Sequence, residues 1–422
     1  MIDIREIREN PQQFKDGAKA KKFDVDIDRL LEVDNDLKLA KQRLQDIATE
    51  KNALGKSIPT LAADQKKTAL DKLSGLKDEQ SSLDEKIKNL QPVFDEILSQ
   101  VPQPPADDVP VGADDTQNVE LRKWGEIPQF DFEPKDHIDL GLALDIIDIE
   151  RGVKLAGTRN YFLKGAGAML HWAVLRFALE HMIQKGYTPM AVPLLMKDEA
   201  MMGTGYFPGA EEQTYQMERD ALNLAGTAEV PVTAYHSGEI LSYEQLPIKS
   251  VAMSTCFRRE AGAAGKDTRG LYRIHQFDKV EQVIIGENNS EKSMAYHHEI
   301  LSNSEAVMQA LRLPYRIVNV CTGDLGRGQL QKFDIEAWMP SRNSYGETHS
   351  ASRFHEFQAR RMNLRYRTEN KKNLFCHTLN NTVIASPRIL IPILELNQNA
   401  DGSVNIPEVL VPYMNGLAVI TR

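Results

Sequence analysis

The chain has 422 residues, enough for two or three domains, and 41% of them are apolar, which suffices for a sizeable core. Its formal net charge of -9 taken alone argues weakly against a nucleic-acid partner. No apolar run approaches the roughly 20 residues that span a bilayer, and the acidic start differs from a signal peptide. We therefore expect a soluble cytoplasmic protein with no membrane partner. The three cysteines lack CxxC spacing and predict buried free thiols, without a zinc site: Cys256, Cys321 and Cys376.

The first hundred residues contain two stretches with apolar residues three and four positions apart. The first runs from Leu30 to Ile58 and the second from Ala69 to Val101, with Pro59 in the turn between them. This spacing predicts helices at about 28–58 and 66–101 that form a long antiparallel coiled-coil hairpin within a domain 1–101, with a kink at Pro92. At 1.5 Å per residue, each helix would be on the order of 40 to 50 Å long. These residues alone favour an ordinary protein-interaction coiled coil.

Prolines and aspartates then interrupt the helical pattern, which predicts a linker at 102–118 and a second domain at 119–422. In that domain, apolar alternation around Ser250 to Cys256 and Gln276 to Ile285 predicts strands. Helical periodicity covers about 165–184 and 291–312. The natural fold class is α+β, with an antiparallel sheet flanked by helices.

The stretch from Val251 to Ile285 predicts an antiparallel hairpin with a charged inner face. On a strand, alternate side chains share a face, so Arg258 pairs with Glu260, and Arg273 with Phe277 and Glu281. Guanidinium groups suit phosphate and carboxylate, an aromatic ring suits a base, and a carboxylate suits an ammonium group. This face is the candidate active site, and a solvated amphipathic hairpin is the alternative.

The string RGLYRIHQFDKVE resembles motif 2 of class II aminoacyl-tRNA synthetases, in the version of the bacterial-type seryl-tRNA synthetase family. Further matching strings follow in the family's order, among them TAEVP, FQARRMNLRYR and IPEVLVPYM. The resemblance covers essentially the whole chain. It implies the class II antiparallel sheet flanked by helices, preceded by the coiled-coil arm, which in this family grips the long variable arm of tRNA(Ser).

The resemblance also implies roles for single residues. Arg258 would bridge the α-phosphate of ATP and the serine carboxylate, Arg388 of motif 3 would hold the γ-phosphate, and Glu347 would complete the catalytic set. The ATP-binding residues would be Arg258, Arg259, Glu260, Arg273, Phe277, Glu347, Thr348, His349, Ser350 and Arg388. Glu347 and Ser350 would bind Mg²⁺, whose hard oxygen ligands they supply. The serine-binding residues would be Thr227, Ala228, Glu229, Arg258, Glu281, Asn380 and Thr382.

For tRNA, Lys266 and Arg269 are the expected contacts of the acceptor end. Motif 1, read with Pro193 as its proline, implies a homodimer in which the arm of one subunit reaches across to the other. tRNA(Sec) is a possible second substrate of such an arm. No second hydrolytic domain is evident, so editing is not predicted.

Two segments depart from the family pattern. Motif 3 usually reads NGSGLAVGR, where this chain has NNTVIASPR, and we expect Ser386 to cap a helix that begins at Pro387, with Pro392 destabilising it. The family's ExSSCS segment is ETHSAS here, and His349 is predicted to be a hydrogen-bonded residue of the pocket wall rather than a base, since a substrate carboxylate is already ionised.

The sequence therefore predicts an ATP- and Mg²⁺-dependent serine–tRNA ligase that works through seryl-adenylate. Two alternatives stay open. One is a synthetase-like paralogue that activates an amino acid for another acceptor. The other is a catalytically degenerate, synthetase-like binding protein, which the two altered segments allow.

Overall fold

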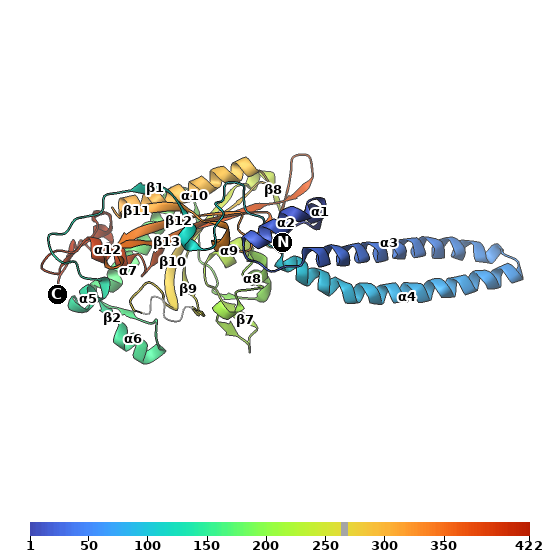
Figure 1. The fold of residues 1–422 in the computed structure, drawn as a ribbon, viewed down its shortest axis with the longest axis horizontal. Coiled ribbons are helices and arrows are strands. Elements are labelled where there is room, and N and C mark those ends of the chain that lie inside the picture. The colour runs from blue at the N-terminus through green and yellow to red at the C-terminus, as the bar shows by residue number, and fades with distance from the viewer. Residues whose placement is uncertain (263–268) are drawn as a thin grey trace. The chain divides into compact units, whose positions relative to one another are not determined.

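The computed structural model describes residues 1–262 and 269–422 (Figure 1). Contacts between residues divide the chain into two units, Met1–Pro104 and Pro105–Arg422. The first unit consists of helices, and α3 and α4 run side by side in opposite directions: α1 (Ile4–Glu9), α2 (Pro11–Ala20), α3 (Ile27–Ser57) and α4 (Ala63–Gln100). The predicted helical hairpin is therefore present, with α4 beginning three residues earlier than expected. Helix α4 continues through Pro92 to its end at Gln100.

The two long helices pack through the predicted apolar stripe, whose buried members on α3 include Leu30, Val33, Leu37 and Ile47. Polar pairs join the helices beside this stripe. Arg43 donates to both carboxylate oxygens of Glu79, at 2.7 and 2.8 Å. Lys51 and Gln80 occupy apolar positions of the repeat and bond to each other at 2.9 Å. Such paired polar groups fix the register of a coiled coil.

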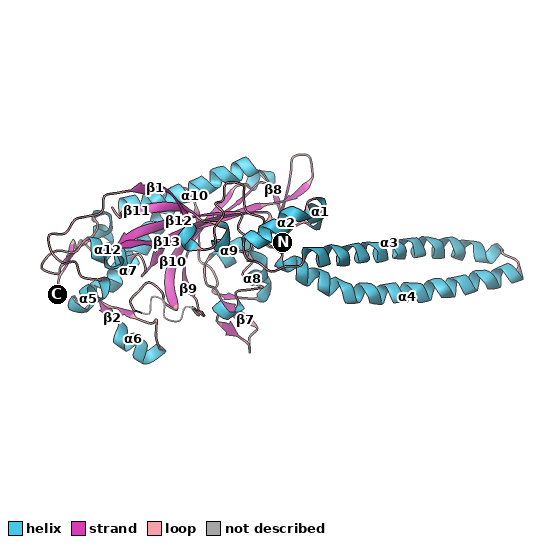
Figure 2. Cartoon of the chain, in the orientation of Figure 1, coloured by secondary structure: helices cyan, strands magenta, loops and turns pink. Residues whose placement is uncertain are grey.

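The second unit is built on an eight-stranded sheet (Figure 2). Every neighbouring pair in it is antiparallel except β4 and β9. The order across the sheet is β1 (Val119–Trp124), β11 (Tyr315–Asn319), β12 (Gln331–Met339), β13 (Ser344–His355), β16 (His377–Ser386), β10 (Gln276–Gly286), β9 (Ile248–Phe257) and β4 (Thr188–Met190). This sheet confirms the predicted α+β class.

Helices α7 (Ala166–Gln184) and α10 (Ser290–Ala310) pack against this sheet and match the two helices predicted in this domain. The other helices are α5 (His137–Ala143), α6 (Ile149–Ala156), α8 (Asp198–Thr204), α9 (Glu229–Ala234), α11 (Phe357–Met362) and α12 (Leu390–Leu396). Small sheets contain β2 (Ile147–Asp148) with β3 (Phe162–Leu163); β5 (Leu195–Met196), β6 (Gln216–Met217) and β7 (Leu222–Leu224); β8 (Ile240–Ser242), β14 (Arg365–Arg367) and β15 (Asn373–Phe375); and β17 (Val404–Asn405) with β18 (Val419–Ile420).

Strand β10 shows how the sheet separates core from site. Val280 and Ile284 face the helices and belong to the main apolar core. Side chains on a strand alternate between its faces, so Phe277, Lys279 and Glu281 point to the opposite side. All three line a cavity there.

The hairpin strands agree with the segments predicted around Ser250 to Cys256 and Gln276 to Ile285, but the charged residues lie beyond the strand ends. Strand β9 ends at Phe257 and β10 begins at Gln276, so Arg258, Glu260 and Arg273 lie on the connection between them. The reason is visible at Glu260, whose φ of 52° takes the backbone out of the extended conformation. The prediction that these three residues lie on strand faces is wrong.

No helix among the described residues is long and apolar enough to cross a membrane. All three cysteines are buried free thiols, as predicted.

Candidate active site

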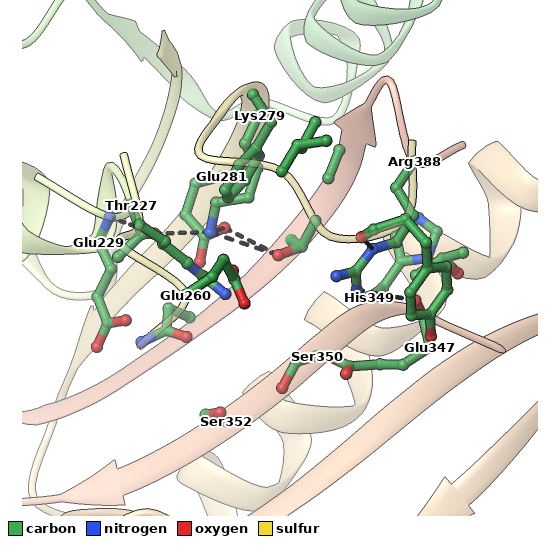
Figure 3. A pocket seen from close by; sticks show the side chains of 18 of the residues that line it. Thr227, Glu229, Glu260, Lys279, Glu281, Glu347, His349, Ser350, Ser352 and Arg388 are labelled. Carbon is green, nitrogen blue, oxygen red and sulfur yellow. Dashed lines mark hydrogen bonds and ion pairs between the residues drawn. The ribbon is translucent and has the colours of Figure 1, made fainter. Parts of the chain in front are cut away.

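The candidate site lies where strands β13 and β16 separate. Their pairing runs from Ala351↔Asn381 to His355↔Thr378. Beyond Ala351 and Asn381, β13 remains paired with β12 and β16 with β10. A cavity of about 170 Å³ occupies this opening (Figure 3). The sheet thus presents polar side chains from three strands to one space.

Most of the site residues predicted from the sequence line this cavity. They are Thr227, Glu229, Arg258, Glu260, Phe277, Glu281, Glu347, Thr348, His349, Ser350, Asn380, Thr382 and Arg388. They come from segments more than 150 residues apart in the chain, from Thr227 to Arg388. The fold therefore brings together residues that the sequence separates.

The structure does not place every predicted residue on this cavity. Ala228 is buried beside it and Arg259 is exposed, and neither lines it. Arg273 lines a neighbouring cavity that also contacts Arg258 and Glu260.

The two predicted tRNA contacts are on the connection between β9 and β10. Arg269 forms an ion pair with Asp139 at 3.0 Å and is largely exposed. Lys266 lies outside the described residues.

Two arginines of the cavity are held over aromatic rings. The guanidinium carbon of Arg258 lies 5.2 Å from the centre of the Phe277 ring. That of Arg388 lies 4.4 Å from the centre of the Tyr272 ring. Arg388 also donates to two backbone carbonyls, that of Tyr272 at 3.1 Å and that of Glu347 at 3.0 Å. These bonds use the Nε and Nη1 groups of Arg388 and fix the guanidinium at the cavity wall.

A buried polar cluster forms the other end of the cavity, and its centre is Lys279, which the sequence analysis missed. Its ammonium group lies 2.5 Å from Glu281 and 2.6 Å from the hydroxyl of Thr227 (Figure 3). Thr382 donates to the same Glu281 carboxylate at 3.2 Å. A signal was available, because Lys279 stands between Phe277 and Glu281 on the same strand face.

Glu229 is the second carboxylate at this end. It accepts from Gln358 at 2.8 Å and from the Tyr206 hydroxyl at 3.4 Å. Burial and the nearby Glu281 raise the pKa of Glu229 to about 7. The cluster therefore contains a carboxyl group that titrates near neutral pH, a property frequent at functional sites.

Glu347 and Ser350 supply oxygen atoms at the opposite wall. Glu347 keeps an exposed surface, and although desolvation by its surroundings opposes ionisation, the positive charges of Arg388, Lys332 and Arg258 lower its pKa below the usual value. Asp334, the cross-strand partner of Ser350, has a buried Oδ1 without a hydrogen-bond partner. Hard oxygen donors of this kind suit Mg²⁺, which usually takes one or two protein carboxylates and completes its shell with phosphates and water. Across the described residues, no cluster of three or more His, Cys, Asp or Glu side chains could hold a metal alone.

His349 is almost fully buried, at 1% exposure, in the same wall. Its Nδ1 lies 2.8 Å from the Thr348 hydroxyl. Burial lowers the pKa of His349 to about 4, against a smaller raising effect of the Val383 carbonyl. The ring is therefore neutral at physiological pH, and its contacts to β13 and β16 agree with the wall position predicted for it.

The sequence comparisons identify the family. Residues 1–105 match the model of the seryl-tRNA synthetase N-terminal domain, and residues 213–397 match the class II tRNA synthetase core domain of the G, H, P, S and T type. The serine–tRNA ligase of Deinococcus radiodurans is 44% identical over 420 residues, which cover 100% of this chain and 99% of that protein. That of Finegoldia magna is also 44% identical, over 98% of both chains. The chain belongs to the seryl-tRNA synthetase family.

Solved structures of the family agree with this assignment. The seryl-tRNA synthetase of Pyrococcus horikoshii, complexed with ATP, has a TM-score of 0.94 and 35% identity, covering 100% of this chain and 99% of that one. The cytoplasmic serine–tRNA ligase of Naegleria fowleri, in complex with AMP, has a TM-score of 0.89 and 32% identity, with the same coverage. The predicted class II fold is confirmed.

The structure corrects the interpretation of motif 3 in this member of the seryl-tRNA synthetase family. Ser386 ends β16 and does not cap a helix, because it pairs with Asp278 in the sheet. Helix α12 begins only at Leu390, so Arg388 lies in the turn before it. Pro392 is the third residue of α12, where a backbone N–H has no partner within the helix. The expected destabilisation by Pro392 is therefore absent.

Asn381, which replaces a glycine of the family's usual motif 3, points away from the cavity toward α10. Its amide donates to the Ile300 carbonyl at 2.7 Å and to the Ser304 hydroxyl at 2.8 Å. Ser304 in turn donates to the backbone carbonyl of Thr382 at 2.9 Å. The larger side chain is thus accommodated by hydrogen bonds on the helix side of the sheet and does not line the cavity.

Proposed function

We propose that this protein is a serine–tRNA ligase that activates L-serine with ATP and transfers it to the 3′ end of tRNA(Ser). The observation that carries this proposal is the single cavity that combines Arg258, Phe277 and Arg388 with the buried cluster around Lys279 and Glu281. One end is suited to a nucleotide and the other to a small polar amino acid. Membership of the seryl-tRNA synthetase family supports the same assignment.

In the first step, an oxygen of the serine carboxylate attacks the α-phosphorus of ATP. The new C–O–P linkage forms as the bond between the α-phosphorus and the bridging oxygen breaks, and pyrophosphate leaves. Two anions must approach each other, and negative charge grows on phosphate oxygens. In this proposal Arg258 binds the α-phosphate and the carboxylate together, Phe277 stacks on adenine, and Arg388 holds the γ-phosphate.

Mg²⁺ belongs to this proposal as a cofactor, held by Glu347 and Ser350. When bound, the ion neutralises the charge of the polyphosphate. The oxygen donors in this wall fit a hard cation, and the bond from Arg388 to the Glu347 carbonyl keeps the guanidinium beside them. The hydroxyl of Thr348, in the same wall, donates to the Ile335 carbonyl and contacts His349. It therefore stabilises the strand rather than binding the ligand.

Serine recognition is assigned to the cluster at the other end of the cavity. The carboxylates of Glu281 and Glu229 would accept the α-ammonium group, while Thr227, Asn380 and Thr382 surround the side chain. A site that hydrogen-bonds a hydroxyl rejects the analogue without it by roughly 10⁴-fold, because its buried polar groups lose their partners. Alanine would be excluded in this way.

In the second step, a ribose hydroxyl at the 3′ end of tRNA attacks the carbonyl carbon of seryl-adenylate, and AMP leaves. Residues 1–101 with the α3–α4 hairpin are proposed as the tRNA-binding domain, 102–118 as a linker and 119–422 as the catalytic domain. Phosphate contacts from Arg269 would orient the acceptor end. The proposal also includes a homodimer in which the arm of one subunit reaches the site of the other. It further includes use of tRNA(Sec) and a cytoplasmic location.

The test is serine-dependent exchange of pyrophosphate into ATP, followed by charging of tRNA(Ser). Exchange and charging with serine, and neither with alanine, are expected. Exchange without charging of tRNA would favour the paralogue with another acceptor. Binding of ATP without exchange for any amino acid would favour the degenerate binding protein.

A further inference from the structure

A chain of hydrogen bonds links three buried or half-buried residues behind the nucleotide end of the cavity. The Nδ1 of His171 lies 2.8 Å from the hydroxyl of Ser386, and its Nε2 lies 2.9 Å from the carboxylate of Asp278. The other oxygen of Asp278 accepts from Thr255 at 2.6 Å. Ser386 is fully buried and His171 is 7% exposed, so Ser386 cannot act as a nucleophile despite its place beside a histidine and an aspartate.

The three residues come from three different elements. His171 lies on α7, Asp278 on β10 and Ser386 on β16, and Asp278 and Ser386 are direct partners in the sheet. The imidazole therefore bridges two neighbouring strands from the helix side. Because a carboxylate only accepts, Nε2 is the donor to Asp278, and burial makes both bonds costly to lose.

The bridge lies directly behind two residues of the cavity. Asp278 follows Phe277, and Ser386 is two residues before Arg388. Ser386 is also the last residue of β16 before the turn that carries Arg388. The side chain of Ser386 is therefore an anchor for that turn from the side opposite to the cavity.

This arrangement depends on residues that depart from the family's motif. The usual NGSGLAVGR string has valine and glycine where this chain has Ser386 and Pro387. Valine has no group that could bond to an imidazole. The departure that left motif 3 in doubt thus supplies the hydroxyl that His171 uses.

We propose that His171 is a positioning residue for ATP binding, which holds the turn of Arg388 through Ser386 and the adenine-side end of β10 through Asp278. This inference rests on the proposed function, because it acts on the nucleotide end of the same cavity. His171 itself does not line the cavity and touches no substrate. Its effect should therefore be confined to ATP.

The test measures ATP binding by calorimetry and the KM values for ATP and serine in pyrophosphate exchange. For His171→Ala, we expect ATP affinity to fall about 10- to 100-fold, as for small misplacements of a binding group, while KM for serine stays unchanged. His171→Gln, which keeps a side chain able to bond to both neighbours, should recover part of the affinity. His181→Ala is the matched control, since His181 lies on the same helix and its ring contacts Phe177 instead.

Ser386→Ala provides a second route if His171→Ala fails to fold, and the same selective loss for ATP is expected. Coupling to Arg388 is decisive: in the Arg388→Ala background, His171→Ala should cause a smaller loss of ATP affinity than in the unmodified protein, because only the route through Asp278 is left. Fully additive losses, or equal changes in both KM values, would overturn the inference. So would ATP binding by both single variants within about twofold of the unmodified protein. If the unmodified protein binds no ATP, the proposed function fails first and this inference fails with it.

Discussion

The ammonium group of Lys279 lies 2.5 Å from the carboxylate of Glu281, and both side chains are almost completely buried. Lys279 also donates to Thr227, so one cation fixes two of the groups assigned to serine. Removing one member of a buried ion pair leaves the other charge uncompensated, which costs about 3 to 5 kcal/mol.

Lys279→Met is accordingly expected to lower serine-dependent exchange at least about 100-fold, mainly through KM for serine. Lys249→Met is the control, because Lys249 on β9 pairs with Glu299 on α10 at 2.8 Å in a more exposed position outside the cavity. Steady-state pyrophosphate exchange at varied serine concentration gives KM for serine in each of the two variants. Equal losses in both variants would show that the Lys279 pair has no special role in the site.

Glu229 predicts a pH dependence of stability. Its pKa of about 7 lies above the ordinary 4.5, because burial and Glu281 disfavour the charged form. As the pH rises, Glu229 ionises at a lower pH in the unfolded chain than in the folded protein. The stability that protonated Glu229 contributes to the folded protein is therefore fully present below about pH 4.5 and is lost by about pH 7. A shift of this size corresponds to about 3 kcal/mol.

Glu229→Gln should therefore lose less stability than the unmodified protein between pH 5 and 7.5, as measured by urea unfolding. Glu369→Gln, at an exposed position, should retain the original slope. Serine binding should also release a proton near neutral pH, since an ammonium group favours the ionised carboxylate. Calorimetry in buffers with different ionisation enthalpies measures this proton release. Its absence would show that Glu229 does not bind the ammonium group of serine.

Periodicity and motif strings predicted much of this fold and site, and the misses have physical causes. The apolar spacing predicted both arm helices, because the residues that pack two helices together recur every three or four positions along each helix. The placing of Arg258 and Glu260 on a strand was wrong, because β9 ends at Phe257 and the positive φ at Glu260, which alternation does not record, leaves the extended conformation. Lys279 could have been noticed between Phe277 and Glu281, but its bond to Thr227, 52 residues away in the chain, follows only from the fold. The bond between His171 and Ser386 spans 215 residues, and no local pattern predicts such a contact.

Arg258 tests the activation step. Arg258→Ala should reduce exchange by about 10²- to 10³-fold, the usual effect of removing one group that stabilises developing charge. The loss should appear in kcat as well as in KM for ATP, since charge on the α-phosphate is greatest in the transition state. Arg312→Ala, an exposed arginine paired with Glu408, is the control. Retention of exchange within tenfold in Arg258→Ala would contradict its role.

A shortened coiled-coil arm tests serine activation and transfer to tRNA separately. Replacing Glu50–Lys77 by a short Gly–Ser turn shortens α3 and α4 together and keeps the Leu30, Val33 and Leu37 packing near the start of α3. Because the described residues that line the activation cavity all belong to Pro105–Arg422, serine-dependent exchange should be unchanged. Charging of tRNA(Ser) should fall at least about 100-fold, since recognition of tRNA shape would lose its contact surface. Exchange and single-turnover charging on the same preparation measure both steps. Undiminished charging would show that the arm does not select tRNA and would favour an ordinary protein-interaction coiled coil.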